Sequence, residues 1–271
     1  MTFTEKLNDI LSSRKSLLCV GLDTVMEKIP AALRQQPDPL FQFNKAIIDA
    51  TLPYAAAFKI NTAFYEAWGL EGWRALEKTF AYLPAEVIKI ADAKRGDIGN
   101  TSLSYSRAVF TGLGADAVTV NPLMGTDSTA PFLQDPEKGV FFLCLTSNPG
   151  SQNFQHFSDG RVRLYEKIAL KVGEWNRHGN CGLVVGATHP AELQGIRSLA
   201  PELPFLIPGI GAQGGDLENS VRFGLTAQGG GVLFNSSRAI LYVSSGYDFA
   251  AAAAAAAKAT RDALNAARSD R

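Results

Sequence analysis

The feature that most constrains the fold of this chain is a regular alternation of short apolar runs with stretches long enough for a helix. The apolar runs cover residues 17–22, 56–60, 86–91, 117–120, 140–145, 182–187, 204–207 and 230–234. Short, continuous apolar runs are typical of strands that are buried on both faces, as in parallel sheets. Eight such runs alternating with helices predict an α/β fold, a (β/α)8 TIM barrel, with an open doubly wound sheet as the alternative.

The intervals between the runs carry helical patterns. We expect helices over residues 38–51, 70–82 and 163–177, and shorter ones over 191–199 and 217–222. The alanine-rich segment 249–267 is interpreted as the last barrel helix, because alanine has the highest helix propensity. Barrels of this length usually fold as one unit, so residues 1–271 are expected to form a single domain.

Composition excludes several classes of protein. The formal charge is zero and no basic stripe is present, which argues against a nucleic-acid partner. No apolar run approaches the roughly 20 residues that span a bilayer, so no membrane partner is expected. The first residues lack the basic and apolar regions of a secretory signal, and Cys19, Cys144 and Cys181 resemble reduced packing residues. A cytoplasmic enzyme is expected. The three histidines are scattered and indicate no metal site.

Polar residues follow every apolar run. The segments after the runs include Asp23, Lys59, Asp92 to Lys94, Asn121, Thr146 to Gly150, Thr188, Pro208 to Gly211, and Asn235 to Arg238. Barrel enzymes carry their catalytic groups at the carboxyl ends of several strands. A barrel without catalytic function has no need of so many charged residues in one place. The sequence therefore predicts an active site at this mouth of the barrel.

The segment from Asp92 to Ile98 carries the most chemical information. Side chains alternate along a strand, so Asp92 and Lys94 are expected on one face, and Asp97 follows after a glycine. Two carboxylates would then flank one ammonium, and opposite charges favour its protonated form. A protonated Lys94 suits an acid and not a Schiff-base lysine, which needs the neutral amine. The alternative is a solvated strand end with incidental ion pairs.

The segment from Gly209 to Gly215 matches the pattern G-x-G-x-x-G. A dinucleotide site would place this pattern after the first strand with an acidic residue about 20 positions later, and neither condition holds. In barrels, the loops after strands seven and eight often bind phosphate. The amide of Gln213 and the guanidinium of Arg238 suit phosphate oxygens, which predicts a phosphorylated small molecule. A flexible turn with a surface arginine is the alternative.

In sequence order, these segments resemble the orotidine 5′-phosphate decarboxylase family, and the resemblance covers essentially the whole chain. The matching segments are Asp92-Ala-Lys-Arg-Gly-Asp-Ile, Thr119-Val-Asn-Pro, Leu145-Thr-Ser-Asn-Pro-Gly, Gly186-Ala-Thr-His-Pro and Pro208-Gly-Ile-Gly-Ala-Gln-Gly-Gly. Their form is similar to the longer bacterial (type 2) branch. The resemblance implies decarboxylation of orotidine 5′-phosphate to UMP, the last step of pyrimidine biosynthesis, without a cofactor or metal.

The resemblance also implies a role for each matching residue. Lys94 would protonate the ring carbon, and Asp92, Asp97 and Lys59 would complete a charged array around it. Asp23 would contact the ribose, Ser147 the pyrimidine, and Gln213 with Arg238 the phosphate. The substrate-binding set also includes Ile98, Thr101 and Pro208. Asp97 and Thr101 would reach into the partner's site across the interface of a homodimer. At Arg238 the sequence departs from the family, because Asn235-Ser236-Ser237 stands where a Gly-Arg pairing is usual.

Two other functions remain open at this point. A metal-assisted sugar-phosphate decarboxylase or synthase of the same suprafamily also uses D-x-K-x-x-D, but it carries a glutamate for magnesium where this chain has Lys59. A noncatalytic phosphate-binding barrel would keep its ligand after loss of Lys94. A chelator and a Lys94 variant distinguish these alternatives.

Overall fold

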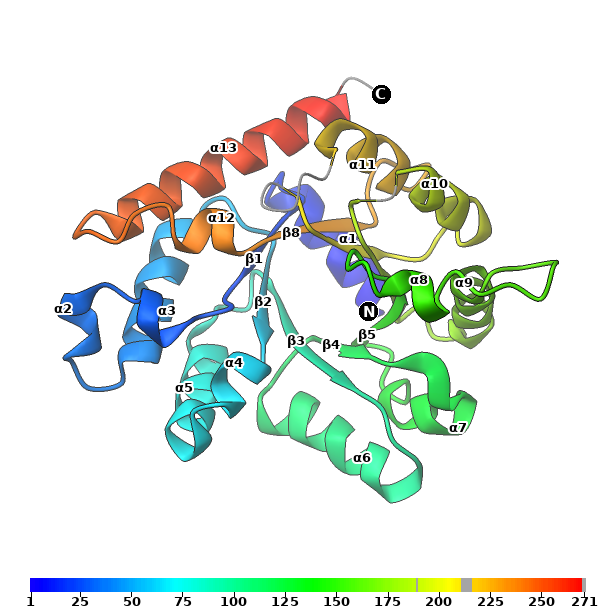
Figure 1. The fold of residues 1–271 in the computed structure, drawn as a ribbon, viewed down its shortest axis with the longest axis horizontal. Helices are drawn as coiled ribbons and strands as arrows, with labels where there is room; N and C mark the ends of the chain where they lie inside the picture. The colour runs from blue at the N-terminus through cyan, green and yellow to red at the C-terminus, as the bar shows by residue number, and fades with distance from the viewer. Residues whose placement is uncertain (189, 211–215, 270–271) are drawn as a thin grey trace.

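The computed structural model describes residues 1–188, 190–210 and 216–269. In this part of the chain, eight parallel strands pair in sequence order, and the last pairs with the first. The strands are β1 (Leu18–Gly21), β2 (Ala57–Asn61), β3 (Ile88–Arg95), β4 (Ala117–Val120), β5 (Gly139–Leu145), β6 (Cys181–Val185), β7 (Phe205–Pro208) and β8 (Val232–Ser236). Figure 1 shows these strands at the centre of a ring of helices. The predicted (β/α)8 barrel is confirmed.

Helices occupy the predicted intervals. The main helices are α1 (Phe3–Ser13), α3 (Pro39–Thr51), α5 (Gly69–Tyr82), α6 (Gly99–Arg107), α9 (Leu164–Trp175), α10 (Pro190–Leu199), α11 (Leu217–Gly224) and α13 (Phe249–Ser269). Shorter helices are α2 (Ala31–Arg34), α4 (Ala63–Glu66), α7 (Thr126–Thr129), α8 (Ser151–Phe154) and α12 (Arg238–Leu241). Single 3-10 or π turns are η1 (Met26–Lys28), η2 (Ala108–Gly112), η3 (Pro122–Met124) and η4 (Ala130–Phe132). The predicted helices are confirmed to within a few residues, whereas α1 and α6 were not predicted.

The strands are buried because helices cover the outer face of the barrel and side chains fill its interior. All four residues of β1 and all four of β4 are buried. The three cysteines are buried and free, and burial raises the pKa of Cys19 to about 12. Among the described helices, none combines the length and hydropathy needed to cross a bilayer.

Helix α1 closes the end of the barrel at which the strands begin. The ring of Phe3 packs edge-on against Phe141, with 5.8 Å between the ring centroids. A Cβ atom at Gly139 would lie 2.4 Å from the ring of Phe3, so glycine is required at the start of β5. Lys6 pairs with Asp116 just before β4, at 2.7 Å. Because α1 covers this end of the barrel, the cavity lies at the other end, where the strands finish.

Strand β3 differs from the regular strand that the sequence suggested. It continues to Arg95, so Asp92 and Lys94 lie within the strand and not after it. Its register with β4 shifts between Ala91 and Arg95, and Lys94 has a φ of 47°, in the left-handed region. Simple alternation therefore does not place Lys94. The bulge directs its side chain instead, and its ammonium still reaches Asp92.

Candidate active site

A cavity of about 320 Å³ opens at the carboxyl ends of the strands. Of the predicted site residues, Asp23, Lys59, Asp92, Lys94, Ser147, Pro208 and Arg238 line it. The predicted residues Asp97, Ile98 and Thr101 do not line it. Gln213 lies outside the described residues. The cavity thus brings together groups from at least five strands, as expected for the catalytic mouth of a barrel.

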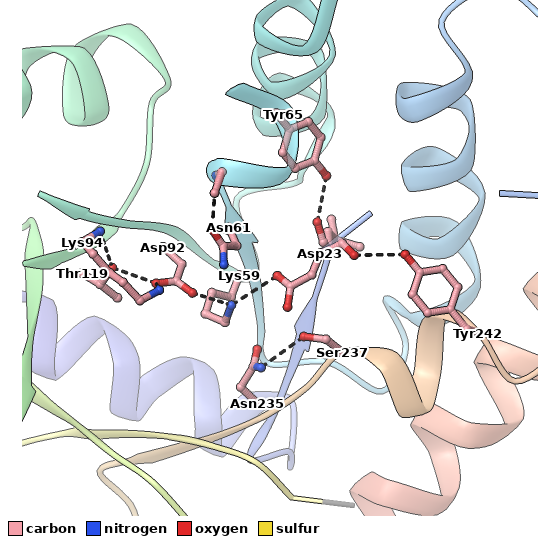
Figure 2. Close-up of polar contacts among 12 residues, drawn as sticks. Asp23, Lys59, Asn61, Tyr65, Asp92, Lys94, Thr119, Asn235, Ser237 and Tyr242 are labelled. Carbon is pink, nitrogen blue, oxygen red and sulfur yellow. Dashed lines mark hydrogen bonds and ion pairs between the residues drawn. The ribbon is translucent and has the colours of Figure 1, made fainter. Parts of the chain in front are cut away.

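A charged array joins β1, β2 and β3 (Figure 2). The Nζ atom of Lys59 lies 2.8 Å from Oδ2 of Asp92 and 3.5 Å from Oδ1 of Asp23. The other carboxylate oxygen of Asp92 lies 2.6 Å from Nζ of Lys94. That oxygen also accepts a hydrogen bond of 2.9 Å from the hydroxyl of Thr119 on β4. Asp92 therefore binds two ammonium groups, one on each carboxylate oxygen.

Strand register explains why these side chains meet. Lys59 pairs with Ile90 on β3, and Asp92 lies two residues further along the same face. Gly21 of β1 pairs with Lys59, and Asp23 follows two residues later. Diagonal neighbours on one face of a sheet are within reach of long side chains. The parallel pairing of three consecutive strands therefore assembles the array.

Burial and the neighbouring charges shift the pKa values of Asp92 and Lys59 in opposite directions, and the charges have the larger combined effect. Burial alone would raise the pKa of Asp92, but the positive charges of Lys59 and Lys94 hold it well below its ordinary value. Burial alone would lower the pKa of Lys59, but Asp92 and Asp23 raise it above its ordinary value. Only 5% of the Lys59 side chain is exposed. Both groups are consequently charged throughout the neutral pH range.

All members of the array line the cavity, and Lys94 is the most exposed of them. Its side chain is 48% exposed, against 10% for Asp92. Its backbone N–H donates to Oγ1 of Thr119 at 3.0 Å, and the next residue, Arg95, forms an ion pair with Glu66. A left-handed backbone at a residue with a Cβ atom costs roughly 1–2 kcal/mol. These neighbouring contacts hold Lys94 in that conformation and present its ammonium to the cavity.

The opposite wall is built from β7 and β8. Because β7 is the fourth strand from β3 in either direction around the barrel, its end lies across the cavity from Lys94. Pro208 and Gly209 line this side, and Gly209 has a φ of 100°, which favours glycine. Arg238 lines the cavity at the start of α12, and it forms no ion pair with any described residue. This cation is available to an anionic ligand.

Two glycines leave space for serine side chains in the loops around the cavity. A Cβ atom at Gly186 would lie 2.9 Å from both Cβ and N of Ser147, so the loop after β5 approaches β6 only because of this glycine. A Cβ atom at Gly21 would lie 1.9 Å from Oγ of Ser237. Ser147 and Ser237 both line the cavity. Gly186, in a segment that carries the resemblance, and Gly21 therefore shape the site through the space they leave.

Thr119 and Asn235 are among the residues that line the cavity and that sequence reasoning gave no role. Thr119 lies on β4 and bonds both Asp92 and the backbone of Lys94. The amide of Asn235 donates to Oγ of Ser237 at 3.3 Å. Both positions occur near the carboxyl ends of apolar runs, which is the signal that could have identified them.

Asp97 lies apart from the array of its own chain. Its Oδ1 accepts a hydrogen bond from the N–H of Ile98 at 2.7 Å, and among the described residues it forms no ion pair. Ile98 is 57% exposed, and Thr101 is exposed on α6. Among the described residues of one chain, Lys94 therefore contacts the carboxylate of Asp92 and not that of Asp97 as the sequence suggested.

Comparisons with known proteins identify the family of this chain. Residues 16–256 match the family model described as the orotidine 5′-phosphate decarboxylase/HUMPS family. A relative named orotidine 5′-phosphate decarboxylase in Dehalococcoides mccartyi is 50% identical over 269 residues, covering 98% of each chain. One from an Azoarcus species with the same name is 51% identical over 270 residues, covering 98% of this chain and 99% of its own.

A solved structure titled OMP decarboxylase from Leishmania donovani superimposes with a TM-score of 0.87 at 43% identity, covering 99% of each chain. The match to the family model and the relatives extends over nearly the whole sequence. On this evidence, the chain belongs to the orotidine 5′-phosphate decarboxylase family of lyases.

Proposed function

We propose that this chain decarboxylates orotidine 5′-phosphate to UMP, the last step of pyrimidine biosynthesis, as a cytoplasmic homodimer that needs no cofactor. The observation that carries the proposal is the ammonium of Lys94, held 2.6 Å from Asp92 at the edge of a cavity. Relatives that are about half identical to this chain bear the name of this enzyme.

The proposed chemistry requires a fixed cation beside the reacting carbon. When the bond between the ring and its carboxylate breaks, carbon dioxide leaves and the electron pair stays on a ring carbon that has no electron sink. A positive charge already in place stabilises that developing carbanion. Lys94 then donates a proton from Nζ to form the new C–H bond. Because its side chain is 48% exposed, the resulting amine can regain a proton from water.

The rest of the array keeps Lys94 in position for this step. Asp92 remains ionised because Lys59 and Lys94 lower its pKa, and it anchors the ammonium of Lys94. Lys59 balances the second negative charge in the buried part of the site. Lys59 also occupies the space between Asp23 and Asp92, where the metal-assisted enzymes need a glutamate for magnesium. This residue favours the metal-free reaction.

The far wall of the cavity suits the phosphate of the substrate. The guanidinium of Arg238 can bind two phosphate oxygens at once, and Gly209 allows close approach of the backbone. We place Gln213 at the same phosphate on the basis of the resemblance. Binding energy from this remote group is realised in the transition state and so contributes to the rate. Asp23 would contact the ribose and Ser147 the pyrimidine.

A second subunit would complete each site. Asp97 and Thr101 point to this arrangement because neither lines the cavity of its own chain. Ile98, Leu123 and Met124 follow the ends of the adjacent strands β3 and β4, and they expose 57%, 63% and 48% of their surface. An apolar surface beside Asp97 suits association with a second copy. The partner's Asp97 would then supply the second carboxylate of the array.

The proposed activity is tested by following the ultraviolet absorbance of orotidine 5′-phosphate in the presence of a chelator. We expect the unaltered chain to consume the substrate and Lys94→Ala to lose at least about a thousandfold in kcat. Lys45→Ala, which removes an exposed lysine, is the matched control and should keep full activity. Circular dichroism checks that both variants fold. Equal turnover by Lys94→Ala would contradict the proposal and support a noncatalytic barrel.

Two further observations separate the proposal from its rivals. Loss of activity on adding the chelator would indicate the metal-assisted enzyme. Borohydride reduction during turnover would trap a Schiff base on Lys94, whereas our proposal predicts no adduct by mass spectrometry.

The shared site is tested by mixing two inactive variants, Lys94→Ala and Asp97→Ala. Hybrid dimers contain one intact site, so random exchange should restore roughly a quarter of the wild-type activity. Mixing each variant with itself is the control. Absence of recovery, once subunit exchange is demonstrated with a mass-labelled chain, would place Asp97 in the site of its own subunit.

A further inference from the structure

The turn after β1, residues 22–25, is bound by side chains from distant parts of the chain. The hydroxyl of Tyr65 donates to the carbonyl of Leu22 at 2.9 Å. The hydroxyl of Tyr242 donates to the carbonyl of Asp23 at 3.0 Å and accepts from the N–H of Val25 at 2.8 Å. Figure 2 shows the two tyrosines approaching Asp23 from different elements. The backbone on both sides of the Asp23 side chain is therefore fixed.

The buried side-chain amide of Asn44 also supports this turn. The side chain of Asn44, on α3, accepts from the hydroxyl of Thr24 at 2.6 Å. Its two N–H groups donate to the hydroxyls of Tyr65 and Thr79, at 2.8 and 2.9 Å. Asn44 is fully buried and has a partner for both its donor and acceptor groups. A fully satisfied buried network of this kind restricts the turn to one conformation.

Tyr242 is itself held in place. Its ring stacks on Phe43 with 6.2 Å between centroids and 13° between planes, and Nζ of Lys28 lies 5.1 Å from the ring centre. Burial raises the pKa of Tyr242, and the negative charges of Asp23 and Glu27 raise it further. The hydroxyl is therefore protonated at neutral pH, as its donation to the carbonyl of Asp23 requires.

Tyr242 also belongs to the wall that carries Arg238. It directly follows α12, the single helical turn that begins with Arg238, and its N–H donates to the carbonyl of Arg238 at 3.3 Å. One short helix thus holds a cavity-facing arginine at its first residue and a tyrosine bonded to the Asp23 turn just beyond its last. This hydroxyl therefore links the turn that carries Asp23 to the helix that begins with Arg238.

We propose that Tyr242 is a positioning residue, whose hydroxyl sets Asp23 at the correct distance from Arg238 for a substrate that contacts both. This inference rests on the proposed function, which assigns the ribose to Asp23 and the phosphate to Arg238. Tyr242 does not line the cavity, so its effect would pass through Asp23 and not through contact with the substrate.

A double-mutant cycle on turnover of orotidine 5′-phosphate tests this. Activity of the unaltered chain, measured first, tests the proposed function by itself. Tyr242→Phe removes one hydroxyl and should lower kcat/KM about tenfold, mainly by raising KM. In an Asp23→Ala background, the same change should alter kcat/KM less than about twofold, because the group it positions is gone.

The control is Tyr82→Phe, which removes a hydroxyl that donates to Asp49 at the surface, at 2.6 Å, and should leave kcat/KM unchanged. Tyr65→Phe frees the carbonyl of Leu22 and one N–H of Asn44 instead, and its effect on kcat/KM should show the same dependence on Asp23. Wild-type kinetics for Tyr242→Phe would overturn the proposal. A loss of the same size with and without Asp23 would overturn it as well, because it would indicate a general effect on the structure.

Discussion

On the β2–β4 side of the cavity, the charged groups are bound to one another within the chain, whereas on the β7–β8 side the cation is left for the ligand. Lys59, Asp92 and Lys94 form ion pairs of 2.6 and 2.8 Å, and Thr119 bonds the same carboxylate. Arg238 has no ion-pair partner among the described residues. The difference matches the two tasks of the proposed enzyme. Catalytic charges must be fixed before the reaction, whereas a binding cation needs the charge of its ligand.

The largest effect on kcat and stability is expected from loss of the ion pairs on the β2–β4 side of the cavity. Asp92→Asn removes the charge that holds both lysines, and it should lower kcat at least about a thousandfold. It should also destabilise the fold by about 3 kcal/mol, because it leaves Lys59 buried without its nearest counter-charge. Kinetics and urea unfolding measure the two effects.

An exposed ion pair of the same length is the matched control for stability. Lys45 and Asp49 also lie 2.8 Å apart, but their side chains are 40% and 49% exposed. Asp49→Asn should therefore cost less than about 0.5 kcal/mol. Equal losses of unfolding free energy in Asp92→Asn and Asp49→Asn would contradict the view that burial makes the loss of a counter-charge costly.

Stability should depend on pH in a manner set by the same array. The pKa of Asp92 is lowered in the folded state, so its contribution is present above the unfolded pKa of about 3.9 and is lost as pH falls through the folded pKa. The stability difference between the wild type and Asp92→Asn should be constant near neutrality and should shrink in acid. Urea unfolding from acid to neutral pH measures it, and a difference that grows in acid would contradict the sign.

A smaller effect is expected on the binding side. Arg238→Ala should lower kcat/KM about a hundredfold, mainly through KM, because a charge-assisted contact to phosphate is lost. Stability should change by less than about 0.5 kcal/mol, since Arg238 forms no ion pair with the described residues. Arg222→Ala, on the exposed face of α11, is the control. Strong destabilisation by Arg238→Ala would remove the contrast between the two walls.

The hydroxyl of Thr119 links Asp92 to the backbone of Lys94. Its loss should affect the kinetics less than the loss of Asp92 or Arg238. Thr119→Val keeps the shape but removes one donor and one acceptor, and should lower kcat about tenfold. Thr51→Val removes a buried hydroxyl that donates to the carbonyl of Ile47 within its own helix, and it should leave kcat unchanged. Similar kinetics for both variants would show that Lys94 is positioned without Thr119.

The smallest effect concerns the backbone of Lys94. With a φ of 47°, Lys94→Gly should be more stable than Lys94→Ala by about 1 kcal/mol. At Lys89, in the regular part of β3, glycine should instead be less stable than alanine. Thermal unfolding of the four variants measures both differences. The same order at both positions would contradict the strained conformation of Lys94.

Much of the fold could be predicted because its signals are local. Each buried strand is a short apolar run, and parallel strands joined through helices leave few arrangements. Helix α1 was missed although its signals are local, a capping box of Thr2 and Glu5 and apolar residues at helical spacing. Only its place against Gly139 depends on residues far along the chain. The bulge in β3 was missed because its register against β4 depends on pairing between strands.

The candidate site divides in the same way. Asp92, Lys94 and Lys59 were identified because they are charged residues at the ends of apolar runs. Thr119 and Tyr242 were not, since a threonine in a strand and a tyrosine after a short helix carry no local sign of their partners. Asp97 adjoined the array in sequence but lies outside the cavity of its own chain.

The barrel, the charged residues and the end of the barrel at which they gather could all be predicted from local sequence patterns. They could be predicted because strand periodicity and the position of polar residues after apolar runs are properties of neighbours along the chain. Which charges touch, how Lys94 is directed towards the cavity and what fixes Asp23 became known only from the folded chain. Those features depend on strand register and on side chains that meet only after folding, such as Tyr242 and Asp23, which lie 219 positions apart in the sequence.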